Sequence, residues 1–189
     1  MPLDDRRERD RVYQAAEDST LLATAAVAAA EPTDRVLDVG TGSGYVAARV
    51  SETGARVVGT DRNPHACRQA SDAGIDTVRT DLTSAFAART FDLVTFNPPY
   101  LPTEPGEAVD DWMAVALSGG ETGRAVIESF LADAGRVLAS EGRVLLLVST
   151  LSGVEAVVDR AVDAGFASET VAEESFPFET LSVLRLSKR

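Results

Sequence analysis

Cysteine, histidine and lysine are each represented once in this chain of 189 residues, by Cys67, His65 and Lys188. One cysteine cannot form an internal disulfide, and one cysteine with one histidine cannot complete a four-ligand zinc site. We therefore expect no metal in this chain and assign any zinc to a partner. His65 is expected on the surface of a helix, and Cys67 as a small apolar helix residue rather than a nucleophile.

Long hydrophobic runs are missing as well. The longest, Leu21 to Ala30, is interrupted by Thr24 and covers about ten residues, whereas a membrane-spanning helix needs roughly 18 to 20. The N-terminus carries the charged run Asp4 to Arg11, and lacks the basic segment and apolar stretch of a secretory signal. We expect a cytoplasmic protein that does not contact a membrane.

Positive charge is scarce. Lys and Arg number 18 against 30 Asp and Glu, so the net charge is −12. A carboxylate-rich, lysine-poor surface stays hydrated in concentrated salt and predicts a halophilic source; the alternative is an ordinary acidic protein from a GC-rich genome. The same acidity argues against nucleic acid as a partner, because tight binding to phosphates normally relies on Lys and Arg.

Seven short segments are predicted to be strands. Two of them, Ala167–Glu173 and Thr180–Ser187, are joined without a helix and predict a C-terminal antiparallel hairpin. The other five are apolar runs that alternate with helix-length segments, a pattern typical of a mostly parallel sheet with helices on both faces. Those five are Arg35–Val39, Arg56–Thr60, Asp76–Arg79, Phe91–Phe96 and Arg143–Ser149. The expected fold is α/β, with one domain at residues 12–189 after a charged tail at residues 1–11.

Helices are expected between these strands. Asp18-Ser19-Thr20 is read as the cap of a first helix, which Glu31-Pro32 ends. The further helices are expected at Tyr45–Glu52, Pro64–Ala73, Thr122–Ala139 and Val154–Ala164. The stretch from Pro98 to Gly120 is read as the one long loop, and loops of that length in compact domains are usually functional or disordered.

A glycine-rich turn follows the first strand, in Asp38-Val39-Gly40-Thr41-Gly42-Ser43-Gly44. A turn of this kind lets a ligand approach the backbone at the carboxyl edge of the sheet. Asp61 and Asp81 close the next two strands, so three acids are expected to line one crevice. Asp61 is suited to ribose hydroxyls and Asp81 to an adenine amino group. A dinucleotide site is the competing interpretation, but its G-x-G-x-x-G spacing is absent.

The fourth strand runs into Asn97-Pro98-Pro99-Tyr100. Two prolines restrict the backbone, so the Asn97 side-chain carbonyl and the Pro98 backbone carbonyl can both point into the crevice. Two acceptors that converge on one NH₂ group orient a planar amide or amine, and Tyr100 can stack on its plane. This arrangement suits transfer of a group to a weakly nucleophilic nitrogen.

At these residues the chain resembles the Rossmann-like S-adenosylmethionine-dependent methyltransferases, and among them the HemK-like protein-glutamine methyltransferases of the short archaeal and eukaryotic branch. Beyond the two motifs above, the resemblance covers three further segments. These are Val12-Tyr13-Gln14-Ala15-Ala16-Glu17-Asp18, Gly119-Gly120-Glu121-Thr122-Gly123-Arg124 and Glu179 to Leu184. It implies a Rossmann-like seven-stranded sheet and covers the chain from Val12 onward.

The resemblance also implies roles for single residues. Asp38 and Gly40 would bind the methionine part of S-adenosylmethionine and Asp61 its ribose, and Gly42 would also contact the cofactor. The adenine would lie against Asp81 and Leu82, and Ser19 would lie near the cofactor. Asn97 and Pro98 would hold the target amide, and Tyr100 is the third expected catalytic residue. Asn97 would also contact the cofactor.

The expected function follows from the same resemblance. It is transfer of a methyl group to the glutamine of the Gly-Gly-Gln motif in a class I release factor, together with a small zinc-binding activator subunit. One rival is a DNA or RNA methyltransferase acting on an exocyclic amine, N6 of adenine or N2 of guanine, because that NH₂ presents the same geometry. A non-catalytic binding module is the rival from another class.

Overall fold

The computed structural model describes residues 11–103 and 111–189. Its centre is a seven-stranded sheet in the order β3-β2-β1-β4-β5-β7-β6. The expected charged tail falls almost wholly outside the described residues. The strands are β1 (Arg35–Val39), β2 (Arg56–Asp61), β3 (Asp76–Arg79), β4 (Phe91–Phe96), β5 (Leu138–Ser149), β6 (Phe166–Ser175) and β7 (Thr180–Lys188).

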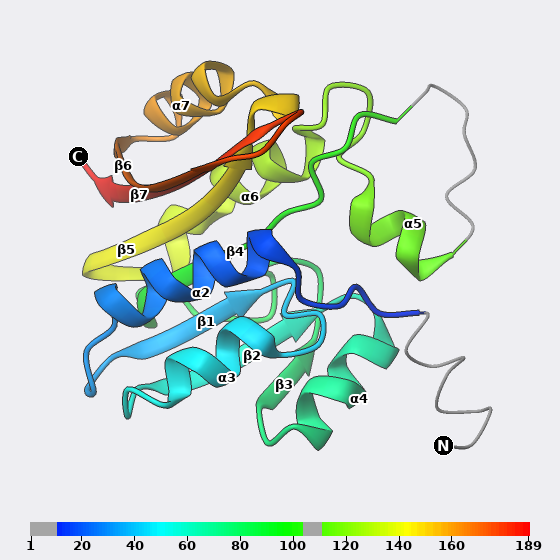
Figure 1. Ribbon diagram of the computed structural model, residues 1–189. Coiled ribbons are helices and arrows are strands. Elements are labelled where there is room, and N and C mark those ends of the chain that lie inside the picture. The colour runs from blue at the N-terminus through cyan, green and yellow to red at the C-terminus, as the bar shows by residue number, and fades with distance from the viewer. Residues whose placement is uncertain (1–10, 104–110) are drawn as a thin grey trace.

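The pairing confirms a mostly parallel sheet that ends in an antiparallel hairpin. β1 lies parallel to β2 and β4, β2 to β3, and β4 to β5, whereas β7 is antiparallel to both β5 and β6. The parallel strands all end on the same edge of the sheet, the edge where β7 begins opposite Ser149. The segments that follow these strands are therefore brought to one rim of the molecule (Figure 1).

Apolar side chains alternate along the strands and pack into two hydrophobic cores, one on each face of the sheet. In β1, Leu37 and Val39 belong to the core on one side of the sheet, and Val36 to the core on the other. One core is completed by α6 (Ala125–Val137) and α7 (Val154–Asp163), the other by α2 (Glu17–Ala29) and α3 (Tyr45–Ser51). Together with α4 (Pro64–Asp72), which packs beside α3, these helices cover both faces as expected. Among the described helices, none is long and apolar enough to cross a membrane.

The ion pair between Arg143 and Asp34 ties β5 to the segment before β1. The guanidinium lies 2.8 Å from the Asp34 carboxylate, whose side chain is only 9% exposed. Arg143 also donates to the backbone carbonyls of Asp92 and Ala29. This cluster closes the edge of the sheet opposite the glycine turn.

Three sequence predictions of local structure are wrong. The stretch from Pro98 to Gly120 is not all loop, because it contains the six-residue helix α5 (Trp112–Leu117), capped by the Asp111 side chain on the backbone N–H of Ala114. The predicted helix Thr122–Ala139 is shorter at both ends: Gly123 has a positive φ of 68°, and Leu138 pairs with Phe91 as the start of β5.

The cap of α2 was also misplaced. The helix begins at Glu17 with Ala16 as its N-cap, and no side chain caps it. Asp18 and Ser19 lie inside the first turn, both buried. The Asp18 carboxylate accepts hydrogen bonds from the Tyr13 hydroxyl at 2.9 Å and from the backbone N–H and hydroxyl of Ser19, and it lines a pocket described below.

Candidate cofactor and substrate site

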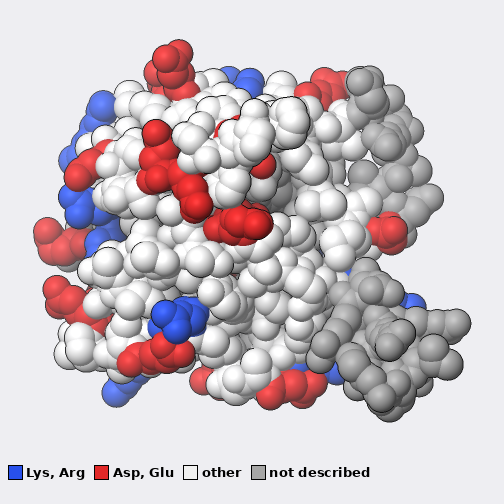
Figure 2. All heavy atoms as spheres, viewed as in Figure 1, with Lys and Arg blue, Asp and Glu red and all other residues white. Residues whose placement is uncertain are grey.

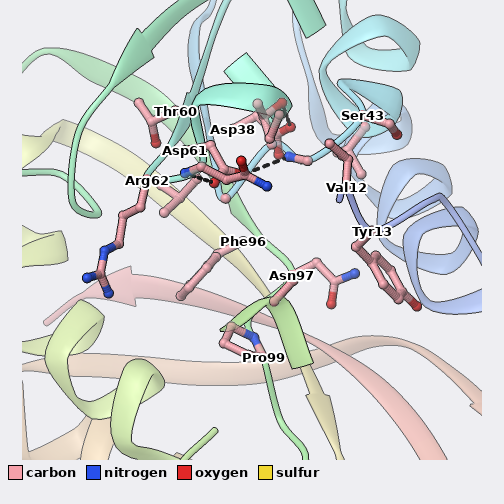
Figure 3. A pocket seen from close by; sticks show the side chains of 18 of the residues that line it. Val12, Tyr13, Asp38, Ser43, Thr60, Asp61, Arg62, Phe96, Asn97 and Pro99 are labelled. Atoms are coloured by element: carbon pink, nitrogen blue, oxygen red, sulfur yellow. Dashed lines mark hydrogen bonds between the residues drawn. The ribbon is translucent and has the colours of Figure 1, made fainter. Parts of the chain in front are cut away.

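A large pocket opens at the carboxyl ends of β1, β2 and β4 (Figure 3). All the residues predicted to contact the cofactor line it, although they come from five separate segments of the chain. They are Ser19, Asp38, Gly40, Gly42, Asp61, Asp81, Leu82 and Asn97. A smaller pocket adjoins it and is lined by Pro98 and Tyr100. Asn97 lines both pockets and so stands between them.

The glycine turn forms the floor of the large pocket. Gly40, Gly42 and Gly44 have φ values of 62°, 54° and 82°, a region that favours glycine. A Cβ on Gly40 would lie 3.4 Å from the ring of Phe96, so the turn also packs closely against the end of β4. Thr41 donates its backbone N–H to the carbonyl of Thr60 at 2.7 Å, which joins the turn to β2. The backbone is thereby exposed to a ligand without side chains in the way.

Asp38 is buried beneath this turn. Its two carboxylate oxygens accept hydrogen bonds from the hydroxyls of Thr41 and Thr95, each at 2.7 Å. Burial raises the pKa of Asp38 to about 6, although both threonine hydrogen bonds oppose the shift. Asp38 therefore places a negative charge behind the glycine turn, while its hydrogen bonds within the protein are already made.

Asp61 connects the end of β2 to the glycine turn. One carboxylate oxygen accepts from the backbone N–H of Gly42 at 3.0 Å, and the other from that of Asn63 at 2.8 Å. Each oxygen keeps a further lone pair for a ligand hydroxyl. Burial raises the pKa of this carboxyl above its ordinary value, and the backbone hydrogen bonds act in the opposite direction.

Asp81 and Leu82 form the outer wall of the pocket. The Asp81 carboxylate is 66% exposed and lies 3.7 Å from the Arg62 guanidinium, so it is more open to water than the two acids before it. Leu82 has a positive φ of 47° and packs against the main core. Its carbonyl accepts from the Thr60 hydroxyl at 3.4 Å. This pair offers a carboxylate beside an apolar side chain.

The amide of Asn97 has an unusual environment. Its Nδ2 donates to the Ser19 hydroxyl at 3.5 Å, whereas its Oδ1 has no hydrogen-bond partner. Within residues 11–103 and 111–189, this is the one buried side-chain nitrogen or oxygen left without a partner. A buried carbonyl without a partner is costly, by about 1 to 3 kcal/mol. The hydrogen-bonding capacity of this oxygen is therefore not used by the described residues.

Several pocket residues were not singled out as site residues from the sequence. Tyr13 lies beside Asn97 (Figure 3) and lines both pockets. Trp112 lines the large one from α5, and Asp18 the small one. The segment Val12 to Asp18 carries a signal for Tyr13 and Asp18, but the position of this acid before an apolar run also fits a helix cap. In the described residues, no three His, Cys, Asp or Glu side chains gather as a metal site would require.

The chain is similar to known methyltransferases. A family model described as a methyltransferase domain matches residues 36–120. The chain is 33% identical over 180 residues to a protein named as an N5-glutamine methyltransferase in Methanocaldococcus jannaschii, with 92% of this chain and 90% of that protein covered. Methyltransferase HEMK2 of Homo sapiens is 32% identical over 192 residues, with 94% of this chain and 90% of HEMK2 covered.

A solved structure shows the same arrangement. The E. cuniculi Mtq2-Trm112 complex, described as responsible for methylating the translation termination factor eRF1, has a TM-score of 0.79 and 28% identity, with 95% of this chain and 99% of that chain covered. The fold is thus that of a Rossmann-like methyltransferase. Within that class, the chain belongs to the HemK-like family of protein N5-glutamine methyltransferases, as the sequence motifs predicted.

Proposed function

We propose that this protein transfers the methyl group of S-adenosylmethionine to the side-chain amide nitrogen of a glutamine, in the Gly-Gly-Gln motif of a class I release factor. The observation that carries the proposal is the buried, unpartnered Oδ1 of Asn97 between the two pockets. A primary amide entering the smaller pocket would supply the missing donor. The NH₂ group would then lie next to the space in which the cofactor is expected.

The large pocket fits S-adenosylmethionine. The glycine turn is a cradle that side chains would fill, and Asp61 retains lone pairs for the ribose hydroxyls. Asp38 would attract the ammonium of the methionine part by its charge, and Asp81 and Leu82 would hold the adenine. Gly40 and Gly42 would allow the methionine part to approach the backbone, with Ser19 alongside. When bound, the cofactor supplies an electrophilic methyl carbon on a sulfonium.

The protein's own residues would act by positioning and by electrostatics. Asn97 Oδ1 and the Pro98 carbonyl would accept hydrogen bonds from the amide NH₂, and so hold its nitrogen toward the methyl carbon and stabilise the positive charge that develops on it. Tyr100 would cover the amide plane. Burial raises the pKa of the Tyr13 and Tyr100 hydroxyls above their ordinary value, so both phenols stay neutral. The amide proton would leave to water after transfer, when the nitrogen is more acidic.

The identity of the substrate and of the partner rests on the relatives. Three further relatives are named release factor glutamine methyltransferases, and the eRF1 methyltransferase of Schizosaccharomyces pombe is named as a catalytic subunit. By analogy with the Mtq2-Trm112 complex, we propose that this chain works with a small activator subunit, which we expect to bind zinc. Residues 12–189 would form one methyltransferase domain after a tail at residues 1–11. An activity in translation supports the cytoplasmic location that we propose.

The surface charge does not favour the nucleic-acid alternative. The chain carries a net charge of −12, and on the face seen in Figure 2 the described residues show scattered carboxylates without a continuous basic stripe. Binding to a phosphate backbone relies on such cationic surfaces. A protein substrate with cationic groups near its glutamine is the better match.

The test is a map of methylated residues by mass spectrometry in cells with and without this protein. We expect one methyl group to disappear from the glutamine of the Gly-Gly-Gln motif in one release factor. In vitro, the purified complex should methylate that release factor and leave its Gln→Asn variant and nucleic acid unlabelled. Labelled nucleic acid would instead favour the exocyclic-amine alternative. Failure to bind S-adenosylmethionine even with the activator present would favour a non-catalytic binding module.

A further inference from the structure

The two ends of the Asn97 amide have nearly the same shape but opposite hydrogen-bonding character. Only one of the two orientations places the carbonyl oxygen toward a substrate NH₂, and the other would present a donor to a donor. Binding of the substrate amide by the Asn97 oxygen therefore requires that the protein favours one orientation of the Asn97 side chain. The Nδ2 of Asn97 meets one described side chain, the hydroxyl of Ser19, at 3.5 Å.

A hydroxyl can donate as well as accept, so Ser19 alone does not select an orientation. Its neighbour Asp18 does. The Ser19 hydroxyl donates to Oδ1 of Asp18 at 3.1 Å, and an ionised carboxylate can only accept. Because the single hydroxyl proton is used there, the oxygen of Ser19 has only lone pairs left for Asn97. Asn97 must then present its NH₂, and not its carbonyl oxygen, to Ser19.

The Asp18 carboxylate is held firmly enough to do this. Its Oδ1 also accepts the backbone N–H of Ser19 at 2.5 Å, and its Oδ2 accepts the Tyr13 hydroxyl at 2.9 Å. Asp18 is 4% exposed and Ser19 is 6% exposed, so water does not compete for these bonds. Asp18 is not the N-cap residue of α2, which is Ala16, and its carboxylate oxygens accept from Tyr13 and Ser19.

We propose that Asp18 is a positioning residue, which acts through the Ser19 hydroxyl to turn the carbonyl oxygen of Asn97 toward the substrate amide. The proposal rests on the proposed function, since it explains how the Asn97 oxygen comes to be presented. It assigns to Asp18 a role distinct from contact with cofactor or substrate. Ser19, which the sequence placed near the cofactor, becomes the link between Asp18 and Asn97.

The test is a double-mutant cycle measured on the complex with its activator, with release factor as substrate and radiolabelled cofactor at saturation. Asp18→Ala should lower kcat about tenfold, as expected for loss of one hydrogen bond that positions a group. In the Asn97→Ala background, the same Asp18→Ala change should leave the residual rate unchanged, because the residue it positions is gone. If the two losses multiply instead, Asp18 acts independently of Asn97 and the inference is overturned.

Substitutions at Ser19 test the link. Ser19→Thr keeps the hydroxyl and should retain activity, whereas Ser19→Ala should match the loss seen for Asp18→Ala. Equal activity of the Thr and Ala variants would contradict the proposed relay. Cofactor affinity, measured by calorimetry, should change less than threefold in Asp18→Ala.

Glu17→Ala is the matched control for an effect of charge at the helix end. Glu17 is exposed and lies in the same first turn of α2, so its removal takes away a negative charge at the same helix terminus. We expect kcat to stay unchanged. A tenfold loss in Glu17→Ala would instead assign the effect to the helix end. If Asn97→Ala itself keeps full turnover, the proposed function fails; if only the cycle is multiplicative, this inference alone fails.

Discussion

Asp61 and Gly42, nineteen positions apart in the chain, are joined by a hydrogen bond of 3.0 Å from the backbone N–H of the glycine to the carboxylate. The bond connects the end of β2 to the turn after β1. The same carboxylate also accepts from Asn63, so one side chain holds the glycine turn and the start of α4 together. Removal of the Asp61 carboxylate therefore affects both the proposed ribose contact and the shape of the glycine turn.

Replacing Asp61 should weaken cofactor binding before it affects turnover. In Asp61→Ala, the backbone N–H groups of Gly42 and Asn63 lose an ionised acceptor, and the ribose hydroxyls lose theirs. A charge-assisted hydrogen bond contributes roughly 1.5 to 3 kcal/mol, so we expect the Kd for S-adenosylmethionine to rise by about 10- to 150-fold. Calorimetry measures this directly. An unchanged Kd with a lower kcat would place Asp61 in the chemistry instead.

Replacing Asn97 should have the opposite effect. Asn97→Ala removes the oxygen that is proposed to hold the substrate amide, and loss of one preorganised polar contact of this kind lowers turnover by about 10² to 10³. The cofactor should bind nearly as before, because the other contacts of the large pocket remain. A radiolabelled methyl assay beside cofactor titration checks both numbers. Retained turnover would remove Asn97 from the mechanism.

Cofactor binding should weaken below pH 6. Burial raises the pKa of Asp38 to about 6, so in cofactor-free protein this carboxyl is protonated at lower pH. A cationic ligand favours the ionised form, and binding must then release a proton. We expect the Kd to rise by up to about tenfold per pH unit below 6. Calorimetry between pH 5 and 8 in buffers of different ionisation enthalpy would detect the proton, and Asp38→Asn should remove the pH dependence.

Ionisation of Asp38 favours cofactor binding but lowers the stability of the folded protein. Its pKa is higher in the folded state than in the unfolded state, so the folded protein holds more protons and the free energy of unfolding falls as pH rises from about 4 to about 6. The Asp38→Asn variant has no carboxyl at this position, so its free energy of unfolding does not fall for this reason as the pH rises. In the absence of cofactor at pH 8, the variant should therefore melt a few degrees higher than the parent protein, although it binds the cofactor less tightly.

The Arg143–Asp34 pair should matter more for stability than the exposed pairs. Arg143→Leu leaves the buried Asp34 carboxylate without its partner, and breaking a buried pair in this way costs about 3 to 5 kcal/mol. The control is Arg35→Leu, because the Arg35–Asp92 pair has side chains 50% and 31% exposed and should contribute less than about 1 kcal/mol. Thermal melts should rank the two variants in this order. Equal losses would show that burial does not distinguish the pairs.

Added salt should stabilise the protein. With a net charge of −12, the folded chain experiences self-repulsion, which salt screens over about 10 Å at 0.1 M and about 3 Å at 1 M. We expect the melting temperature to rise steadily between 0.1 and 2 M KCl, as the halophilic interpretation of the composition predicts. A melting temperature that stays flat or falls would favour an ordinary acidic protein. Equal osmolarity of sucrose is the control for effects unrelated to charge.

Much of the sheet could be predicted because its strands are short apolar runs bounded by polar residues. β1, β3 and β4 have the bounds expected from the sequence. The carboxyl ends of parallel strands share an edge, and that rule was enough to bring Asp38, Asp61, Asp81 and Asn97 to one pocket. Their assignment to cofactor and substrate remains a prediction.

Other features could not be predicted from the sequence because they depend on contacts between distant segments. Thr95 is 57 positions from Asp38, and nothing local in the sequence indicates that its hydroxyl would hold that carboxylate. Asp18 had the spacing of a helix cap, and only the nearby Tyr13 hydroxyl and Ser19 reveal what its carboxylate does. α5 has six residues, too few for an apolar periodicity to be recognised among the surrounding Pro, Gly and acidic residues.

Lys188, the sole lysine, lies near the end of β7, where its Nζ donates to the carbonyl of Leu138 at 2.8 Å. β7 starts at the rim with the pocket and runs away from it, so this amine lies at the opposite edge of the sheet. Besides the terminal amine, a reagent that attacks primary amines finds a single target on the chain. A fluorophore or a sensor surface attached there would leave the pocket facing solution, which suits the protein to surface-based measurements of cofactor and release-factor binding.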